Sequence, residues 1–257
     1  MELSLDIHLA DGYKSNAQRA RRLTEGWFLK NMFCPACSAN CLFQTSGNTK
    51  VVDFFCPECE AQYQLKSKAG TLGRKIHDAA YEPMIERIQA NRSPHFAFLN
   101  YLQGTWRVQN LFIIPGYFFV PSVIERCRPL SPNARRSGWV GCNILAYKLP
   151  RDAFVPVIER ERVLPKEIVR QQWKKFSWFA SQAAQKREWT TDILRCLNQI
   201  EKARFELRDL YAFKHELSKQ HPQNRNIEAK IRQQLQILRD KGILRFTGRG
   251  AYEMVKE

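Results

Sequence analysis

The sequence predicts a mixed α/β domain with an embedded zinc site, followed by a winged-helix domain. Two Cys-x-x-Cys pairs lie near the N-terminus, and strand-like apolar runs alternate with helical patterns as far as about residue 184. Beyond that point, three helical segments precede a short hairpin. We therefore assign residues 1–184 to the first domain and residues 185–257 to the second, with a linker at residues 182–186.

The composition is that of a soluble globular protein with a polyanionic partner. Of 257 residues, 44% are hydrophobic and 26% charged, and the formal net charge is +16. This charge favours nucleic acid. An anionic membrane is the runner-up, but no basic helix with a continuous apolar face supports it. There is no apolar run of about eighteen residues and no secretory leader, so we expect no membrane span. The eight cysteines suit a reducing cytoplasm.

The cysteine pairs predict a structural zinc ion bound by Cys34, Cys37, Cys56 and Cys59. Eighteen residues separate the two pairs. Four soft thiolates presented by tight turns suit a tetrahedral Zn²⁺ ion. The alternative is two unrelated pairs of buried thiols, and Cys41 is close enough in sequence to compete as a ligand.

A candidate catalytic hairpin overlaps the cysteine pairs. Asp53 lies on the apolar run of residues 51–55, and Gln64, Leu65 and Lys66 follow the second cysteine pair. Strand alternation places Gln64 and Lys66 on one face and Leu65 on the other. The second cysteine pair would then form the turn between these two strands. A solvated strand face is the alternative, and Glu25 is a further candidate acid near the hairpin.

The rest of the first domain reads as helices and strands in mixed order. A first helix is predicted at residues 13–31, with Ser15 or Asn16 as its cap. A second helix is predicted at residues 71–90, with an apolar stripe that begins at Ile76. The remaining predictions are strands at residues 95–101, 106–114 and 154–158, and a helix from Pro165 to about Ser181.

One loop combines arginines with a large aromatic residue. Arg135, Arg136 and Trp139 lie within six residues of Ala134, beside a glycine. Tryptophans usually belong to the core, but an exposed tryptophan among arginines is suited to stacking on a base or to wedging between bases. Both interpretations of Trp139 remain open from the sequence.

The C-terminal segment has the pattern of a winged helix. Helices are predicted at residues 189–202, 206–219 and 226–241, and a hairpin at residues 243–252 with Arg249 at its tip. In such a fold the third helix enters the major groove and the hairpin contacts the DNA backbone. The polar side chains that would face DNA from the third helix are Lys230, Arg232, Gln233 and Arg239. A protein-binding winged helix is the alternative, which these basic residues disfavour.

Taken together, these motifs resemble the DpnI-type restriction endonucleases, which require methylated DNA. The segments that carry the resemblance are Tyr13–Asn16, Leu23–Glu25, Asp53–Phe54, Leu65–Lys68, Ala134–Arg136, Gly138–Ile144 and Lys230–Asp240. The resemblance covers nearly the whole chain and implies a PD-(D/E)xK nuclease domain with a zinc site, followed by a winged helix. It also implies that both domains recognise GATC containing N6-methyladenine in double-stranded DNA.

The resemblance further implies specific roles for site residues. Asp53 matches the metal-binding acid of the family, Lys66 the catalytic lysine, and Trp139 a DNA-contacting tryptophan. Asp53, the Gln64 side-chain oxygen and the Leu65 carbonyl would hold Mg²⁺ or Mn²⁺, with Lys66 orienting the attacking water. The chain departs from the family at one position, because the family has Glu where this chain has Gln64.

Two classes of function therefore remain in competition. The first is a methyl-directed type II restriction endonuclease that acts as a monomer and hydrolyses phosphodiesters with Mg²⁺. The second is a non-catalytic reader of methylated DNA, or a transcription regulator, whose nuclease site has degenerated. Gln64 is the feature that keeps the second class open.

Overall fold

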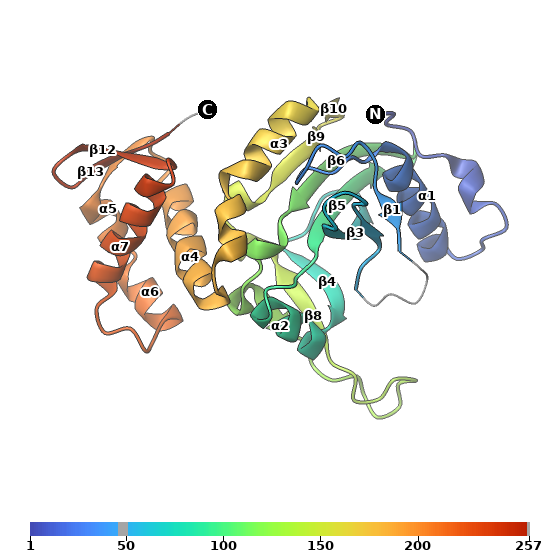
Figure 1. The fold of residues 1–257 in the computed structure, drawn as a ribbon. Helices are drawn as coiled ribbons and strands as arrows, with labels where there is room; N and C mark the ends of the chain where they lie inside the picture. The colour runs from blue at the N-terminus through green and yellow to red at the C-terminus, as the bar shows by residue number, and fades with distance from the viewer. Residues whose placement is uncertain (46–50, 256–257) are drawn as a thin grey trace. The chain divides into compact units, whose positions relative to one another are not determined.

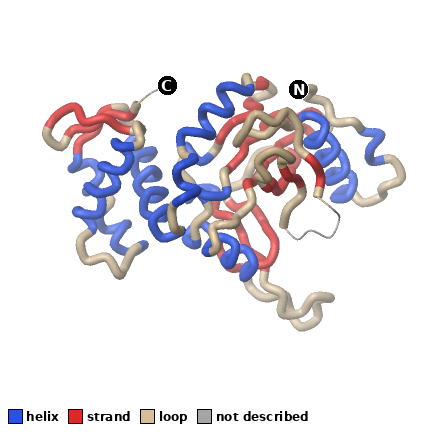
Figure 2. The backbone as a smooth tube through the Cα atoms, in the orientation of Figure 1, coloured by secondary structure: helices blue, strands red, loops and turns tan. Residues whose placement is uncertain are grey.

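The computed structural model describes residues 1–45 and 51–255, which form two compact units (Figure 1). The first unit contains Met1–Tyr147 and Ala153–Ala184, and the second contains Lys148–Asp152 and Gln185–Glu257. Most strands belong to the first unit, whereas the second is mainly helical (Figure 2). No helix within the described residues is long and apolar enough to cross a membrane.

A mixed seven-stranded sheet forms the centre of the first unit, with the strand order β1-β2-β3-β5-β6-β9-β10. The long strands β3 (Gln62–Ala69) and β5 (His95–Leu102) are parallel, and β6 (Arg107–Ile114) is antiparallel to β5. The strands predicted at residues 95–101, 106–114 and 154–158 are thereby confirmed to within a residue. The short strands are β1 (Phe43–Gln44), β2 (Phe54–Phe55), β9 (Val155–Glu159) and β10 (Arg162–Val163).

Helix α1 (Asn16–Asn31) confirms the first predicted helix and covers one face of this sheet. Its Trp27 and Phe28 are buried in the same core cluster as Ala97 and Leu99 of β5. Because side chains alternate along a strand, the even-numbered residues of β5 point to the opposite face. There the ring of Phe96 packs against Phe119, with 4.6 Å between the ring centroids.

Residues 71–90 do not form the single helix that the sequence predicts. Strand β4 (Lys75–Ala80) occupies the first half, and the helix α2 (Tyr81–Gln89) begins directly after it. β4 pairs with β8 (Gly141–Leu145), which also pairs with β7 (Ile124–Arg126), in a separate three-stranded sheet. The prediction was wrong because the hydrogen-bonding partner of β4 lies far away in the sequence. The periodicity of a short apolar run cannot report such a partner.

Helix α3 (Lys166–Lys175) begins after Pro165 as predicted, but it ends earlier than Ser181. A 3₁₀ helix, η6 (Ser177–Ser181), follows it, and the Phe179 side chain in η6 is buried. Val169 and Trp173 of α3 join the core cluster that also contains α1 residues. The other 3₁₀ helices are η1 (Ile7–Ala10), η2 (Gly116–Phe118), η3 (Pro121–Val123), η4 (Ala146–Lys148) and η5 (Arg151–Ala153).

Among the described residues, the second unit contains four α-helices and a small three-stranded sheet. Helix α4 (Ala184–Ile200) starts inside the stretch predicted as a linker, so that prediction was wrong. The helix predicted at residues 206–219 is broken into α5 (Leu207–Tyr211) and α6 (Lys214–Gln220). The third predicted helix is confirmed as α7 (Ile227–Asp240), and the hairpin as β12 (Leu244–Gly248) and β13 (Ala251–Met254). A further strand, β11 (Arg204–Glu206), pairs with β13.

Helix α7 is anchored by its apolar face and by its N-terminal cap. The Asn226 side chain accepts a hydrogen bond from the backbone N–H of Ala229 at 3.2 Å, which satisfies a free helix-end donor. The predicted apolar stripe is buried and consists of Ile227, Ile231, Leu235 and Leu238. Arg232, Gln233 and Arg239 are exposed on the remaining faces of the helix, whereas Gln234 is buried and accepts from the Thr190 hydroxyl.

Candidate functional site

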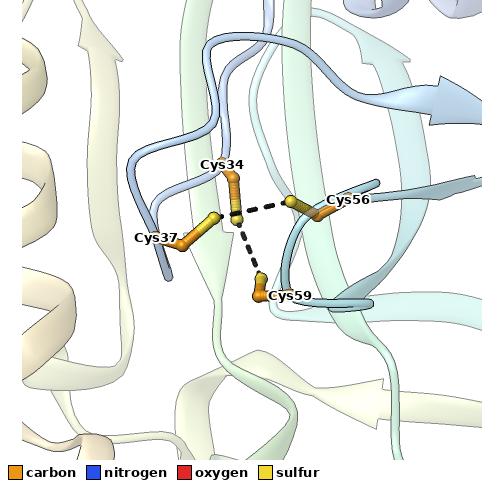
Figure 3. Close-up of side chains that lie close together, drawn as sticks. All are labelled: Cys34, Cys37, Cys56 and Cys59. Atoms are coloured by element: carbon orange, nitrogen blue, oxygen red, sulfur yellow. Dashed lines mark hydrogen bonds between the residues drawn. The ribbon is translucent and has the colours of Figure 1, made fainter.

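The four predicted zinc ligands come together in the first unit (Figure 3). Their sulfur atoms all lie within 4.8 Å of one another. Two contacts join one pair to the other: the sulfur of Cys34 lies 3.6 Å from that of Cys59, and the sulfur of Cys37 lies 3.5 Å from that of Cys56. Tetrahedral ligands at the usual Zn–S distance would be roughly 3.8 Å apart. The cluster therefore fits one zinc ion, and the alternative of two unrelated thiol pairs is wrong.

Neighbouring groups hold these cysteines in place. The Tyr63 hydroxyl lies 3.1 Å from the Cys34 sulfur, and burial raises the pKa of that tyrosine well above its ordinary value. The hydroxyl therefore keeps its proton and is suited to donate to a thiolate at Cys34. Burial also raises the pKa of the Cys34 thiol to about 11, so binding of a metal would have to displace its proton. Cys41 is exposed and is not part of the group.

Helix α3 is hydrogen-bonded to the first cysteine loop, which contains Cys34 and Cys37. The guanidinium group of Arg170 donates to the backbone carbonyls of Cys34, Ser38 and Ala39 at 3.3, 3.0 and 3.1 Å. The second cysteine loop is closed by its own backbone, since Cys56 N–H donates to the Ala61 carbonyl at 2.9 Å. This loop forms the turn between β2 and β3, as the sequence predicts.

The carboxylate of Asp53 lies beside β3 and contacts the backbone of Leu65, the residue between Gln64 and Lys66. The Asp53 N–H donates to the Tyr63 carbonyl at 2.9 Å, which continues the β2–β3 pairing by one residue. In return, Oδ2 of Asp53 accepts from the backbone N–H of Leu65 at 2.9 Å. The fold thus brings the predicted residues of the two strands into contact.

The alternation expected on β3 is present. Leu65 packs against the core cluster that contains α1, and the Ser67 hydroxyl lies 3.0 Å from the Thr24 hydroxyl of α1. Gln64 and Lys66 instead meet a side chain of β4 on the opposite face. This side chain is Asp78, which is not among the residues that the sequence predicts for the site.

Asp78 accepts from both polar residues of this face through the same oxygen. Its Oδ1 lies 2.5 Å from Nζ of Lys66 and 3.3 Å from Nε2 of Gln64. The Asp78 side chain is fully buried, and Gln64 is 7% exposed. The assignment of residues 71–90 to a helix concealed Asp78. The acidic residue in the short run of residues 75–80, which follows Gly70 and Gly73, was the available signal.

Glu25 also lies in this region, as anticipated. Its carboxylate is 2.6 Å from the guanidinium group of Arg21 on the same helix. The pKa of Arg21 is raised chiefly by that hydrogen bond, and the charge of Asp53 adds to the effect. Arg21 is therefore near both acids, and its charge compensates that of Glu25.

The loop with Arg135, Arg136 and Trp139 connects β7 to β8 and projects from the body of the first unit (Figure 1). The guanidinium carbon of Arg136 lies 4.8 Å from the centre of the Trp139 ring. Trp139 is half-buried and Arg135 is exposed. A Cβ atom at Gly141 would lie 2.8 Å from the tryptophan ring, so the ring rests directly on that glycine. Trp139 is thus neither a core residue nor fully exposed.

The predicted DNA-contacting residues of the second unit lie on α7 and on the hairpin. Arg232, Gln233 and Arg239 are exposed, and Lys230 is half-buried above the Trp189 ring. The Arg239 guanidinium interacts with Asp240 at 2.8 Å and lies 4.5 Å from the centre of the Phe246 ring. Arg249 is exposed at the turn between β12 and β13. Four of these residues thus lie on α7, and Arg249 lies at the turn of the hairpin.

Two protein-family models match the chain, and together they span almost all of it. The model described as DpnI, Dam-replacing family, matches residues 1–182. The model described as the Dam-replacing helix-turn-helix domain matches residues 185–254. The cysteine cluster, the β3 site and the loop of Trp139 all lie within the first match, while α7 and the hairpin lie within the second.

Proposed function

We propose that this chain, which belongs to the DpnI, Dam-replacing family, is a restriction endonuclease that cleaves double-stranded DNA at GATC containing N6-methyladenine. Family membership indicates a methylation-dependent restriction endonuclease with a helix-turn-helix domain. The sequence target and the dependence on Mg²⁺ are our proposals. The observation that carries the catalytic part is the contact between Asp53 and the strand that bears Gln64 and Lys66.

We assign the catalytic work to a PD-(D/E)xK nuclease domain, residues 1–184, and place the winged-helix domain at residues 185–257. The proposed metal-binding atoms are Asp53 carboxylate oxygens, the Gln64 side-chain oxygen and the Leu65 carbonyl. Oxygen donors suit a hard cation such as Mg²⁺. Gln64 fits this role because its Oε1 is buried without a hydrogen-bond partner among the described residues. When bound, Mg²⁺ or Mn²⁺ would polarise the scissile phosphate and activate a water molecule.

The remaining steps fall to the side chains. Lys66 would orient the attacking water and stabilise negative charge that develops on the phosphate. Asp53 is held beside β3 by the Leu65 N–H, so its second oxygen is free of that bond. Zn²⁺ at the four cysteines would be structural, because four thiolates leave no open position for water. It would connect the catalytic hairpin to the segment that precedes it.

Recognition of DNA would use both units. In the first unit, Arg135 and Arg136 are suited to phosphates, and the Trp139 ring to stacking or wedging at a base step. In the second unit, α7 would read the major groove and Arg249 would contact the backbone. A methyl group forms no hydrogen bond, so an apolar pocket must recognise it, at about 1–3 kcal/mol per methyl. Reading by both units would multiply the selectivity.

One experiment tests this proposal directly. Plasmid DNA with methylated or unmethylated GATC is incubated with the purified protein, with and without Mg²⁺. We expect cleavage only of methylated DNA and only with the metal. Binding of methylated DNA without cleavage in either Mg²⁺ or Mn²⁺ would instead support the non-catalytic reader.

A further inference from the structure

The fold leaves two buried oxygen atoms without partners at the same place. Oε1 of Gln64 and Oδ2 of Asp78 have no hydrogen-bond partner among the residues that the structure describes. Both side chains are more than nine-tenths buried, with exposures of 7% and 3%. Buried polar atoms in native proteins almost always have a partner. Both atoms are hydrogen-bond acceptors. A donor or a cation from outside the chain would therefore satisfy them.

The contact between the two side chains orients both free oxygens. Nε2 of Gln64 donates to Oδ1 of Asp78 at 3.3 Å, so the amide nitrogen faces the carboxylate. Reversing the amide would place two oxygen atoms against each other, which is unfavourable. The Gln64 oxygen is therefore the atom that remains available. The neighbouring thiol of Cys142 does not compete for Asp78, because it donates to the Ala79 carbonyl at 3.4 Å.

Formal charge gives a second, independent argument. Gln64 is neutral, and Asp53 and Lys66 together sum to zero. Glu25 is compensated by Arg21 at 2.6 Å. With these groups alone, a divalent cation would meet no net attraction. Asp78 adds one negative charge. Its ion pair with Lys66 and its hydrogen bond with Gln64 hold this charge at the site.

We propose that Asp78 is a second carboxylate of the divalent-cation site, where it supplies the negative charge that Gln64 lacks. Oδ2 of Asp78 and Oε1 of Gln64 face the cation, while Oδ1 of Asp78 retains Lys66. In this arrangement the second carboxylate comes from β4, and the Gln64 amide on β3 donates to it. This inference rests on the proposed nuclease function, since that function supplies the need for the cation.

The test measures cation binding without DNA, so that it does not depend on cleavage. Full-length protein is titrated with Mn²⁺, and free Mn²⁺ is followed by electron paramagnetic resonance. The variants are Asp78→Asn, Gln64→Glu and the double variant Gln64→Glu/Asp78→Asn. Glu82→Gln is the matched control, because Glu82 is on α2 just after β4 and its side chain is 67% exposed. Melting temperature and zinc content verify that each variant folds.

We expect Asp78→Asn to weaken Mn²⁺ binding by on the order of 10- to 100-fold, the range for groups that support a metal site. The double variant returns a carboxylate to the site and should recover most of the wild-type affinity. Glu82→Gln should bind as wild type. If Asp78→Asn does not fold, the double variant is compared with Gln64→Glu, and it should bind more weakly.

Three results would overturn the inference. Wild-type affinity in Asp78→Asn would show that the carboxylate does not face the cation. A lack of recovery in a folded double variant would show that Asp78 acts only by packing and by holding Lys66. Equal affinity of the double variant and Gln64→Glu would lead to the same conclusion. These results leave the nuclease proposal intact, whereas a wild-type protein that neither binds Mn²⁺ nor cleaves methylated DNA removes both.

Discussion

The backbone N–H of Leu65 donates a 2.9 Å hydrogen bond to the carboxylate of Asp53, twelve residues earlier in the chain. This bond fixes an acid beside the centre of β3. We therefore expect Asp53→Ala and Lys66→Ala each to reduce cleavage of methylated GATC by at least about 100-fold, as for loss of a group that stabilises charge during reaction. Binding of the same duplex, measured by fluorescence anisotropy, should be retained.

Asp11→Ala is the control for that experiment, because the Asp11 side chain is 78% exposed and lies 3.4 Å from the His8 ring on the surface. It should cleave as wild type. Normal cleavage by either Asp53→Ala or Lys66→Ala would contradict the assignment of the catalytic hairpin.

Gln64→Glu should lower the Mg²⁺ concentration that gives half-maximal cleavage. A carboxylate at this position restores one negative charge while keeping an oxygen donor, so a divalent cation is attracted more strongly. In the wild type, Mn²⁺ should substitute well for Mg²⁺, because it accepts a wider range of ligands. The measurement is the initial cleavage rate over a metal titration. A wild type that is inactive at every concentration, beside an active Gln64→Glu, would establish the reader function.

Purified protein should contain about one zinc ion per chain, the stoichiometry of a four-thiolate site. Cys56→Ser should lose zinc and lower the melting temperature, because binding energy at such sites contributes to folding. Cys41→Ser offers a close control, since Cys41 is exposed and lies outside the cluster. Metal analysis measures the zinc content, and thermal unfolding measures the melting temperature. A folded, active and zinc-free protein would refute the site.

Gly141→Ala should weaken binding of methylated DNA by displacing the Trp139 ring. The added Cβ would be 2.8 Å from that ring, which is too close for the ring to stay in place. Trp139→Ala should have a similar effect, and the double variant should be no worse than the more affected single variant, since both act on one ring. Equilibrium binding to a methylated duplex checks this. Fully additive effects would mean that the two residues act separately.

Arg249→Ala should weaken binding to methylated and unmethylated GATC by about the same factor, as expected of a phosphate contact. It should also reduce the slope of log affinity against log salt by about one. Arg245→Ala is a comparison on the same hairpin, because Arg245 is already paired with Glu253 at 2.6 Å. Its effect should be smaller. A change in preference for methylated DNA with Arg249→Ala would assign that residue to recognition of the target instead.

Local signals in the sequence were enough to predict several parts of the fold. The doubled cysteine spacing identified the cluster of four cysteines, and the apolar period of α7 identified its buried face. Strands β5 and β6 were also predictable, because each is rich in apolar residues and a turn with Gly104 separates them. The residues of the site on β3 followed from strand alternation once the hairpin turn was recognised.

The parts that failed depend on contacts between distant segments. Strand β4 exists because Ile76 pairs with Ile144, and no local pattern in residues 71–90 contains that information. Asp78 was missed for the same reason, since only this pairing brings it to Gln64 and Lys66. Likewise, the half-buried state of Trp139 depends on the absence of a side chain at Gly141. The sequence left open whether Trp139 lies in the core or is exposed, and the residue occupies neither position.

The turn at the second cysteine pair also determines to which face of the sheet each side chain of β3 points. Strand β2 pairs with β3 through only two residue pairs, Phe54 with Tyr63 and Phe55 with Gln62. A slip of one residue in a strand exchanges its two faces. One residue inserted between Cys59 and Gln62 would therefore turn Gln64 and Lys66 toward α1 and present Leu65 to β4. The length of this loop therefore matters as much as the side chains of the site, and deletions there should be as damaging as loss of the lysine itself.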